Sequence, residues 1–239
     1  MLKSLPIWQQ NHINDCIQRN LFANKDVLEV GGMTNFKITS DVLHAKSWIS
    51  FDPVYKTDFK NEFWEHNNIY VQDFKTDKKY DFIIATNSFE HIHNLDIVLD
   101  KLYDLLKPNG KLSALLGPIW SCHKGHHVYL NPDVSFNNIK IPNWAHLLYS
   151  YEDINNILKQ NYNDDIVEKL MPQFNNWDFL NHMFYDDYYD LIHNSKFKIL
   201  EFRDWHTSIY PDKQTQKILE EKYNRKNFST VSIKMLLEK

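Results

Sequence analysis

The most informative stretch of the sequence is Asp26-Val27-Leu28-Glu29-Val30-Gly31-Gly32. Its apolar residues are typical of a buried strand, and the paired glycines predict that this strand runs into a tight turn. Because glycine carries no side chain, such a turn can bring the backbone close to a ligand. The stretch therefore predicts a buried strand followed by a binding loop.

Other parts of the chain repeat an alternation of strands and helices. Strand-like runs occupy residues 48–53, 80–86 and 111–116, and a helical pattern of leucines from Leu95 to Leu106 lies between the last two. This alternation of strands and helices predicts a parallel sheet with helices on both of its faces. Near the end, residues 197–202 and 230–237 flank a polar helix at 213–223, and we expect the last strand to be antiparallel.

Two segments fall outside that alternation. Residues 4–22 carry apolar side chains at helical spacing and predict an amphipathic helix ahead of the main fold. Residues 120–177 lack the repeating pattern, are rich in aromatic residues and asparagine, and predict an insertion over one end of the sheet.

Composition limits the classes of function. A chain of 239 residues that is 43% hydrophobic can bury a core, and its net charge of -4 lacks the basic field of a nucleic-acid binder. The two cysteines, Cys16 and Cys122, have neither a metal-binding spacing nor a disulfide framework. No apolar run approaches the roughly 20 residues that cross a bilayer, and the start lacks the pattern of a signal peptide. We therefore expect a cytoplasmic protein without membrane insertion, whose oligomeric state stays open.

Polar residues at the ends of the first two strands point to a nucleoside. Ligands of an open α/β sheet bind at the carboxyl ends of its strands. Gly31 and Gly32 follow the first strand, and Asp52 closes the second strand about 20 residues later, where a carboxylate can accept both hydroxyls of a ribose.

Five motifs in order resemble those of class I S-adenosylmethionine (SAM)-dependent methyltransferases. They occupy residues 27–32, 51–53, 71–74, 81–92 and 106–112. The resemblance implies a Rossmann-like, mostly parallel seven-stranded sheet with an antiparallel C-terminal strand and a substrate-lid insertion. It also implies one domain, divided into an N-terminal cap helix (1–25), a SAM-binding core (26–118), an acceptor loop and lid (119–177) and C-terminal helix and strands (178–239).

The same resemblance implies roles for individual residues around SAM. Glu29, Gly31 and Gly32 would line the methionine and ribose part, Asp52 would hold the ribose, Asp73 with Phe74 would contact adenine, and Asn87 would lie beside the sulfonium. The sequence departs from many family members, because Met33 stands where a further spaced glycine is common. That departure counts against a pyrophosphate cofactor such as NAD or FAD more than against SAM, which carries no phosphate.

The acceptor side is predicted to lie after residue 116, where three histidines occur within five residues. Methylation of a hydroxyl requires removal of its proton, and a neutral imidazole with a pKa near 6.5 is suited to that task. His127 and His126 are the favoured candidates for this base, and His91 is a third; each can instead serve a structural role. A metal site is not predicted, because the side chains of adjacent histidines point in different directions in most backbones.

The expected reaction is transfer of a methyl group to a hydroxyl of a sugar, a nucleotide-linked sugar or another precursor of a surface (capsule) polysaccharide. This acceptor follows from a similarity of the 120–127 loop and the aromatic insertion to methyltransferases of bacterial surface-polysaccharide biosynthesis. The alternatives are an N-methyltransferase and a non-catalytic SAM-binding partner protein. Eight aromatic residues are candidates either for an acceptor lid or for the core: Trp144, Tyr149, Tyr151, Trp177, Phe184, Tyr185, Tyr188 and Tyr189.

Overall fold

The computed structural model describes residues 2–32, 34–56, 58–175 and 178–239. Met33 and Trp177, which the sequence analysis named, lie outside the described residues.

The first half of the chain supplies most of the main sheet. In chain order it contains η1 (Leu2–Ser4), α1 (Ile7–Gln18), β1 (Asp26–Val30), α2 (Phe36–Asp41), β2 (Ser47–Phe51), β3 (Phe59–Lys60), β4 (Trp64–Asn67), η2 (Val71–Asp73), β5 (Tyr80–Thr86), η3 (Phe89–His91), α3 (Leu95–Leu105) and β6 (Leu106–Leu116).

The second half supplies the insertion and the end of the sheet. It contains β7 (Tyr129–Asn131), β8 (Val134–Ser135), α4 (Ala145–Leu148), α5 (Tyr151–Asn161), α6 (Asp164–Asn175), α7 (Tyr185–His193), β9 (Lys198–His206), α8 (Lys213–Tyr223) and β10 (Thr230–Glu238).

The strands of the main sheet lie in the order β3-β4-β2-β1-β5-β6-β10-β9. β1 pairs in parallel with β2 on one side and with β5 on the other, which places the loop after Val30 at the middle of the sheet. β10 is antiparallel to both β6 and β9, so the predicted antiparallel C-terminal strand is confirmed. The two-residue strand β3 adds an antiparallel edge beyond β4 that the sequence pattern did not indicate.

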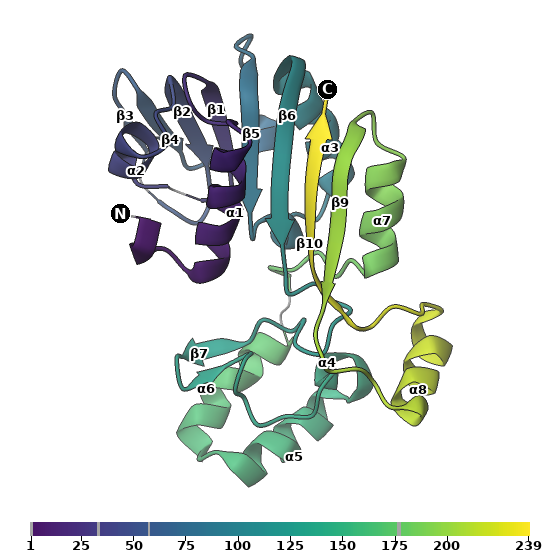
Figure 1. Ribbon diagram of the computed structural model, residues 1–239. Coiled ribbons are helices and arrows are strands. Elements are labelled where there is room, and N and C mark those ends of the chain that lie inside the picture. The colour runs from purple at the N-terminus through teal and green to yellow at the C-terminus, as the bar shows by residue number, and fades with distance from the viewer. Residues whose placement is uncertain (1, 33, 57, 176–177) are drawn as a thin grey trace.

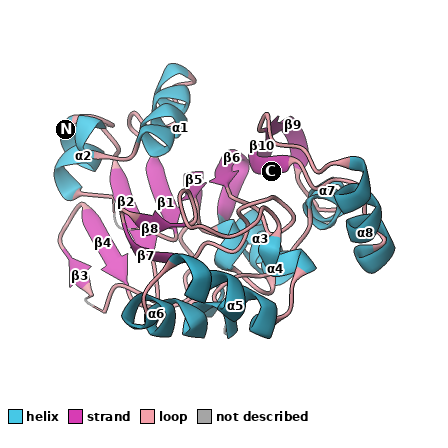
Figure 2. Ribbon diagram, turned by 90° about the horizontal axis from the view of Figure 1, so that it is seen from below, coloured by secondary structure: helices cyan, strands magenta, loops and turns pink. Residues whose placement is uncertain are grey.

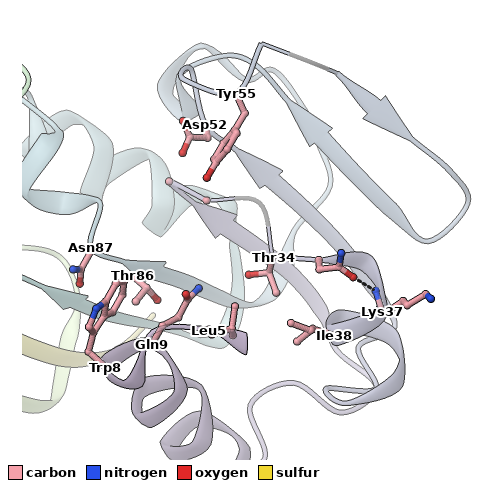
Figure 3. Close-up of a pocket in the computed structure, with 13 residues that line it drawn as sticks. Leu5, Trp8, Gln9, Thr34, Lys37, Ile38, Asp52, Tyr55, Thr86 and Asn87 are labelled. Carbon is pink, nitrogen blue, oxygen red and sulfur yellow. Dashed lines mark hydrogen bonds between the residues drawn. The ribbon is translucent and has the colours of Figure 1, made fainter. Parts of the chain in front are cut away.

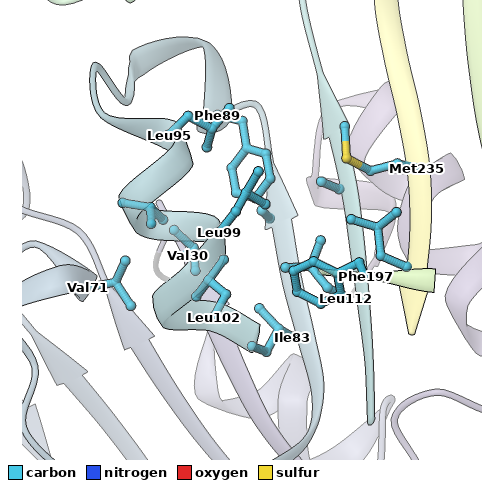
Figure 4. Packing of buried hydrophobic residues seen from close by; sticks show 14 of the residues in the cluster. Val30, Val71, Ile83, Phe89, Leu95, Leu99, Leu102, Leu112, Phe197 and Met235 are labelled. Carbon is cyan, nitrogen blue, oxygen red and sulfur yellow. The ribbon is translucent and has the colours of Figure 1, made fainter. Parts of the chain in front are cut away.

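Alternate residues of the central strands bury their side chains in two cores on opposite faces of the sheet. On one face, Leu99 and Leu102 of α3 pack over Ile83 and Leu112 (Figure 4). Residues of α7 belong to the same core. On the other face, α1 and α2 cover Val27 and Phe82. Figure 2 shows α1 and α2 on one side of the strands and α3 on the other. Burial on both faces explains why these strands are continuous apolar runs.

The segment between β6 and α7 lies beyond the carboxyl ends of the parallel strands (Figure 1). It has a small hydrophobic core of its own, which is separate from the two cores of the sheet and contains Val128, Val134, Ile154, Leu158, Val167, Leu170, Met171 and Phe174. None of the helices in the described part of the chain is long and apolar enough to span a membrane.

The aromatic residues that were candidates for a lid have divided roles. Trp144 and Tyr188 are buried in core clusters, and Phe184 and Tyr185 pack against such clusters. Among the candidates in the described part of the chain, only Tyr149, Tyr151 and Tyr189 expose much of their surface.

Candidate functional site

A cavity of about 600 Å³ opens at the carboxyl ends of β1, β2 and β5 (Figure 3). The loops after these strands form one wall, and the beginnings of α1 and α2 form the other. Its lining residues are Leu5, Trp8, Gln9, Gly31, Gly32, Thr34, Asn35, Lys37, Ile38, Asp52, Tyr55, Thr86 and Asn87. The volume lies within the range of about 300–1,000 Å³ that is usual for small-molecule sites.

Gly31 allows the central loops to approach each other closely. Its φ of +68° is in the left-handed region, and a Cβ atom there would lie 2.2 Å from Cβ of Ser88. Ser88 in turn donates a hydrogen bond from its hydroxyl to the carbonyl oxygen of Val30 at 2.9 Å. Any side chain at position 31 would therefore push apart the loops after β1 and β5.

Glu29 lies beneath this loop, not on the cavity surface. Its buried carboxylate accepts hydrogen bonds from the Thr34 backbone N–H at 3.0 Å, from the Thr34 hydroxyl at 2.5 Å and from Nε1 of Trp48 at 3.0 Å. Burial raises the pKa of Glu29, while these donors act in the opposite direction. Glu29 thus holds the turn that carries Gly32 and Thr34, both of which do line the cavity.

Asp52 lines the cavity at the end of β2, as expected of a residue that closes this strand. Its Oδ1 accepts a hydrogen bond from the Val54 backbone N–H at 2.8 Å, and Tyr55 lies beside it (Figure 3). Asp73 and Phe74, in contrast, are not among the lining residues. Asp73 is exposed, and the ring of Phe74 packs 4.6 Å from that of Phe51.

Asn87 connects the cavity to the loop after β6. It lines the cavity, adopts a left-handed φ of 49°, and donates a hydrogen bond from Nδ2 to the carbonyl oxygen of Gly117 at 3.1 Å. The side chain therefore joins the predicted cofactor side to the predicted acceptor side.

The structure brings together His127 and His91, whose ring centroids are 5.4 Å apart. Nε2 of His127 bonds to the carbonyl oxygen of Pro118 at 2.5 Å, and Nδ1 of His91 bonds to that of Phe179 at 2.8 Å. Since a carbonyl oxygen can only accept, these nitrogens carry hydrogens in both neutral rings. The lone pairs are consequently on Nδ1 of His127 and Nε2 of His91.

Both imidazoles are uncharged at neutral pH. Burial lowers the pKa of His127 to about 4, although the Pro118 carbonyl raises it in part. Partial burial also lowers the pKa of His91, while the Phe179 carbonyl and the charge of Asp52 raise it. The influence of Asp52 indicates that His91 lies near the cavity that this carboxylate lines.

His126 has a different environment from its neighbour. It is buried, its Nδ1 accepts a hydrogen bond from the Val128 backbone N–H at 3.2 Å, and its ring lies near those of His146 and Phe174. Burial lowers its pKa well below the usual value. These contacts anchor His126 inside the insertion. His91, His126 and His127 are not among the residues that line the cavity.

Comparisons with known proteins identify others that share the fold. Residues 8–116 match the family model described as a methyltransferase domain. A putative SAM-dependent methyltransferase from Listeria monocytogenes superposes with a TM-score of 0.54 at 13% identity, covering 96% of this chain and 98% of that chain. The fold is that of a class I methyltransferase.

Two further solved structures have this methyltransferase fold. A SAM-dependent methyltransferase from Mesorhizobium loti gives a TM-score of 0.53 at 9% identity, covering 95% of this chain and 98% of that chain. Coclaurine N-methyltransferase, solved with N-methylheliamine and SAH, gives 0.52 at 10% identity, covering 96% of this chain and 72% of that chain. No curated protein matches the sequence.

Sequence reasoning missed one wall of the cavity in this methyltransferase fold. Leu5, just before α1, and Trp8 and Gln9, in the first turn of α1, face the loops after the strands (Figure 3). The available signal in the sequence was the tryptophan itself, and the structure leaves Trp8 40% exposed. Tyr55 was also missed, although it follows Asp52 by only three positions.

Within residues 2–32, 34–56, 58–175 and 178–239, no three His, Cys, Asp or Glu side chains converge as they would around a metal ion. The clustered histidines of the acceptor loop instead bond to backbone groups or contact other rings.

Proposed function

We propose that this protein binds SAM in the cavity and transfers its methyl group to a hydroxyl of a small, carbohydrate-related acceptor. The observation that carries the proposal is the cavity itself, in which Gly31, Gly32 and Asp52 meet at the ends of adjacent strands of a methyltransferase fold. A nucleoside requires this combination of close backbone approach and a carboxylate.

The residues present fit the cofactor. Gly31 and Gly32 expose backbone without side chains on the cavity wall, and the Asp52 carboxylate retains Oδ2 for ribose hydroxyls. Gly32 would contact the methionine part, with Glu29 acting from beneath, and Asn87 would lie beside the sulfonium. We retain the adenine contact of Asp73 and Phe74 as part of this proposal, supported by the contact of Phe74 with Phe51 directly before Asp52.

SAM supplies a methyl group activated by the positive charge on its sulfur. The chain's task is to orient the acceptor hydroxyl and to remove its proton. Nδ1 of His127 takes that proton as the oxygen–methyl bond forms and the sulfur–methyl bond breaks. His91, 5.4 Å away between ring centroids, orients the hydroxyl through Nε2.

A base with a low pKa is adequate for this reaction. An oxygen that has gained a methyl group while still protonated is a strong acid, so even a weak base removes its proton. Burial keeps His127 uncharged, which ensures that the lone pair on Nδ1 is present at neutral pH.

Aromatic rings around the two histidines support a sugar as the acceptor. Phe136 stacks on His127 with centroids 5.9 Å apart, and Phe179 stacks on His91 at 6.0 Å. Flat apolar surfaces of this kind pack well against the C–H faces of a sugar ring. The link to surface-polysaccharide precursors is part of the same proposal and is supported by the resemblance of the 120–127 loop. An amine acceptor would need less help from a base. The presence of two uncharged histidines therefore favours a hydroxyl acceptor over an amine.

The first experiment is calorimetric titration of the protein with SAM and, separately, with NAD. We expect saturable binding of SAM alone. Incubation with SAM and a panel of free and nucleotide-linked hexoses, followed by mass spectrometry, would then identify the acceptor. Binding of SAM without methylation of any hydroxyl or amine would favour the non-catalytic alternative, and methylation confined to amino sugars on nitrogen would favour the N-methyltransferase.

A further inference from the structure

The carboxyl group of Glu90 is buried at the junction of the cofactor and acceptor sides. Only 2% of this residue is exposed, and Oε1 accepts a hydrogen bond from the Gly117 backbone N–H at 3.1 Å. No donor among the described residues reaches Oε2. Burial raises the pKa of Glu90 to about 8, so the group is mostly protonated at neutral pH. A buried carboxyl with a single hydrogen bond is destabilising, so its presence here requires an explanation.

Glu90 and Asn87 bond to the two peptide groups that flank the Cα atom of Gly117. Glu90 accepts from the N–H of Gly117, and Asn87 donates to its carbonyl oxygen. On its other side, Gly117 packs closely against the backbone of β10. A Cβ atom built on Gly117 would lie only 2.6 Å from the carbonyl oxygen of Val231, so the residue has no room to move away from Glu90 and Asn87. The position of this turn is therefore fixed by the loop after β5.

The next residue of the turn contacts the proposed base. The carbonyl oxygen of Pro118 accepts the hydrogen bond from Nε2 of His127. The backbone of Glu90 is itself anchored, since the Asn181 backbone N–H donates to its carbonyl oxygen at 2.9 Å. A continuous series of contacts thus connects the Glu90 side chain, Gly117, Pro118 and His127.

We propose that Glu90 is a positioning residue for methyl transfer, acting through Gly117 and the Pro118 carbonyl on the imidazole of His127. The proposal rests on the function proposed above, in which His127 is the base. Glu90 touches neither the cofactor nor the acceptor in this role.

The test compares Glu90→Gln, Glu90→Ala and the control Glu65→Gln. Glutamine keeps an oxygen that can accept from Gly117, whereas alanine removes it. Glu65 pairs with Lys60 at 2.8 Å on β4, at the far side of the sheet. The first readout is the ¹⁵N NMR spectrum of the His127 ring, which reports its tautomer without any acceptor.

We expect wild type, Glu90→Gln and Glu65→Gln to show hydrogen on Nε2 of His127, and Glu90→Ala to show a mixture of tautomers.

The second readout is kcat, measured with the hexose that is methylated fastest in the acceptor screen. Glu90→Ala should lower kcat by about 10- to 100-fold, the range for a misplaced catalytic group. Glu90→Gln should retain most of kcat, and the Kd for SAM should change less than twofold in every variant. An unchanged tautomer and unchanged kcat in Glu90→Ala would overturn the proposal while leaving SAM binding as evidence for the function.

A second variant applies if Glu90→Ala does not fold. Glu90→Asp keeps the carboxyl group but shortens its reach to the Gly117 N–H, so it should show the mixture of His127 tautomers and the lowered kcat expected of Glu90→Ala. A ring spectrum and a kcat like those of the wild type would contradict the proposal.

Discussion

His127 donates a hydrogen bond from Nε2 to the carbonyl oxygen of Pro118 at 2.5 Å. The contact fixes which ring nitrogen carries the hydrogen and leaves the lone pair on Nδ1. A half-buried imidazole held in one tautomer next to a second histidine can accept a proton on its free nitrogen. The first prediction follows from this geometry.

Replacement of His127 by alanine should lower the rate of methyl transfer by about 10²- to 10⁴-fold, as is usual for a positioned base. His127→Gln should show the same loss, because an amide cannot take the proton. The Kd for SAM, measured by calorimetry, should stay unchanged. His193→Ala, an exposed histidine on α7, serves as the control. Normal rates in both His127→Ala and His91→Ala would assign the pair a structural role.

The pH dependence should reflect the burial of His127. With a pKa of about 4, the ring is in its basic form at all higher pH values, so the rate should be flat from about pH 7.5 to 5.5 and fall only as pH approaches 4. The ordinary imidazole value of 6.5 would instead place this loss near neutrality. Rates measured between pH 4 and 7.5 distinguish the two, and a loss centred at 6.5 would mean that the base is more exposed than His127.

Asp52→Ala should weaken SAM binding by at least about tenfold, because a carboxylate that accepts two ribose hydroxyls contributes roughly 1.5–3 kcal/mol. The circular dichroism spectrum should not change. Asp77→Ala, which removes an exposed carboxylate away from the cavity, is the matched control. Equal Kd values for all three proteins would remove Asp52 from the ribose site.

Glu90 should make the stability of the fold depend on pH. Its pKa of about 8 in the folded state exceeds the ordinary value of 4.5, so the unfolded chain releases the proton first as pH rises. Burial of Glu90 therefore leaves the free energy of unfolding independent of pH below about 4.5 and lowers it as pH rises toward 8, by about 3 kcal/mol at pH 7. Urea unfolding of wild type and Glu90→Gln from pH 5 to 8 should reveal a steeper decline in the wild type. Parallel curves would show that Glu90 is ionised in the folded protein.

Chelation of divalent metals should leave methyl transfer unchanged. A general base removes the proton in the proposed reaction, so no Lewis acid is required. The check is the rate before and after exhaustive dialysis against EDTA. Loss of turnover that one divalent ion restores would replace the histidine base by a metal-bound acceptor.

Local patterns in the sequence predicted the centre of the fold and part of the site. The uninterrupted run of buried residues in β1, the turn at Gly31 and the acid that follows β2 each depend on a few consecutive residues. These signals were sufficient to predict the sheet, its antiparallel last strand and the lining positions Gly31, Gly32 and Asp52.

The missing wall of the cavity depends on contacts between distant segments. His12 places α1 on the sheet by bonding to the Thr86 hydroxyl at 2.9 Å and to the Ser113 hydroxyl at 2.8 Å. Lys234 adds an ion pair to Asp15 of α1 at 2.6 Å. No spacing within residues 4–22 reveals those partners, so Trp8 and Gln9 could not be assigned to the site. The separation of His126 from His127 has the same origin, because rings from His146 and His91 determine it.

The insertion between β6 and α7 carries its own hydrophobic core, while its Trp144 and Leu147 pack against Leu219 and Phe228 outside it. Exchange of residues 128–175 for a segment of another shape that keeps Trp144 and Leu147 would leave both cores of the sheet intact. Asn181 lies outside that range and bonds to the carbonyl oxygens of Phe89 and Ile92, so the loop that bears His91 would keep its anchor. New acceptor preferences could therefore arise, by evolution or by grafting, through changes in one contiguous stretch of the gene.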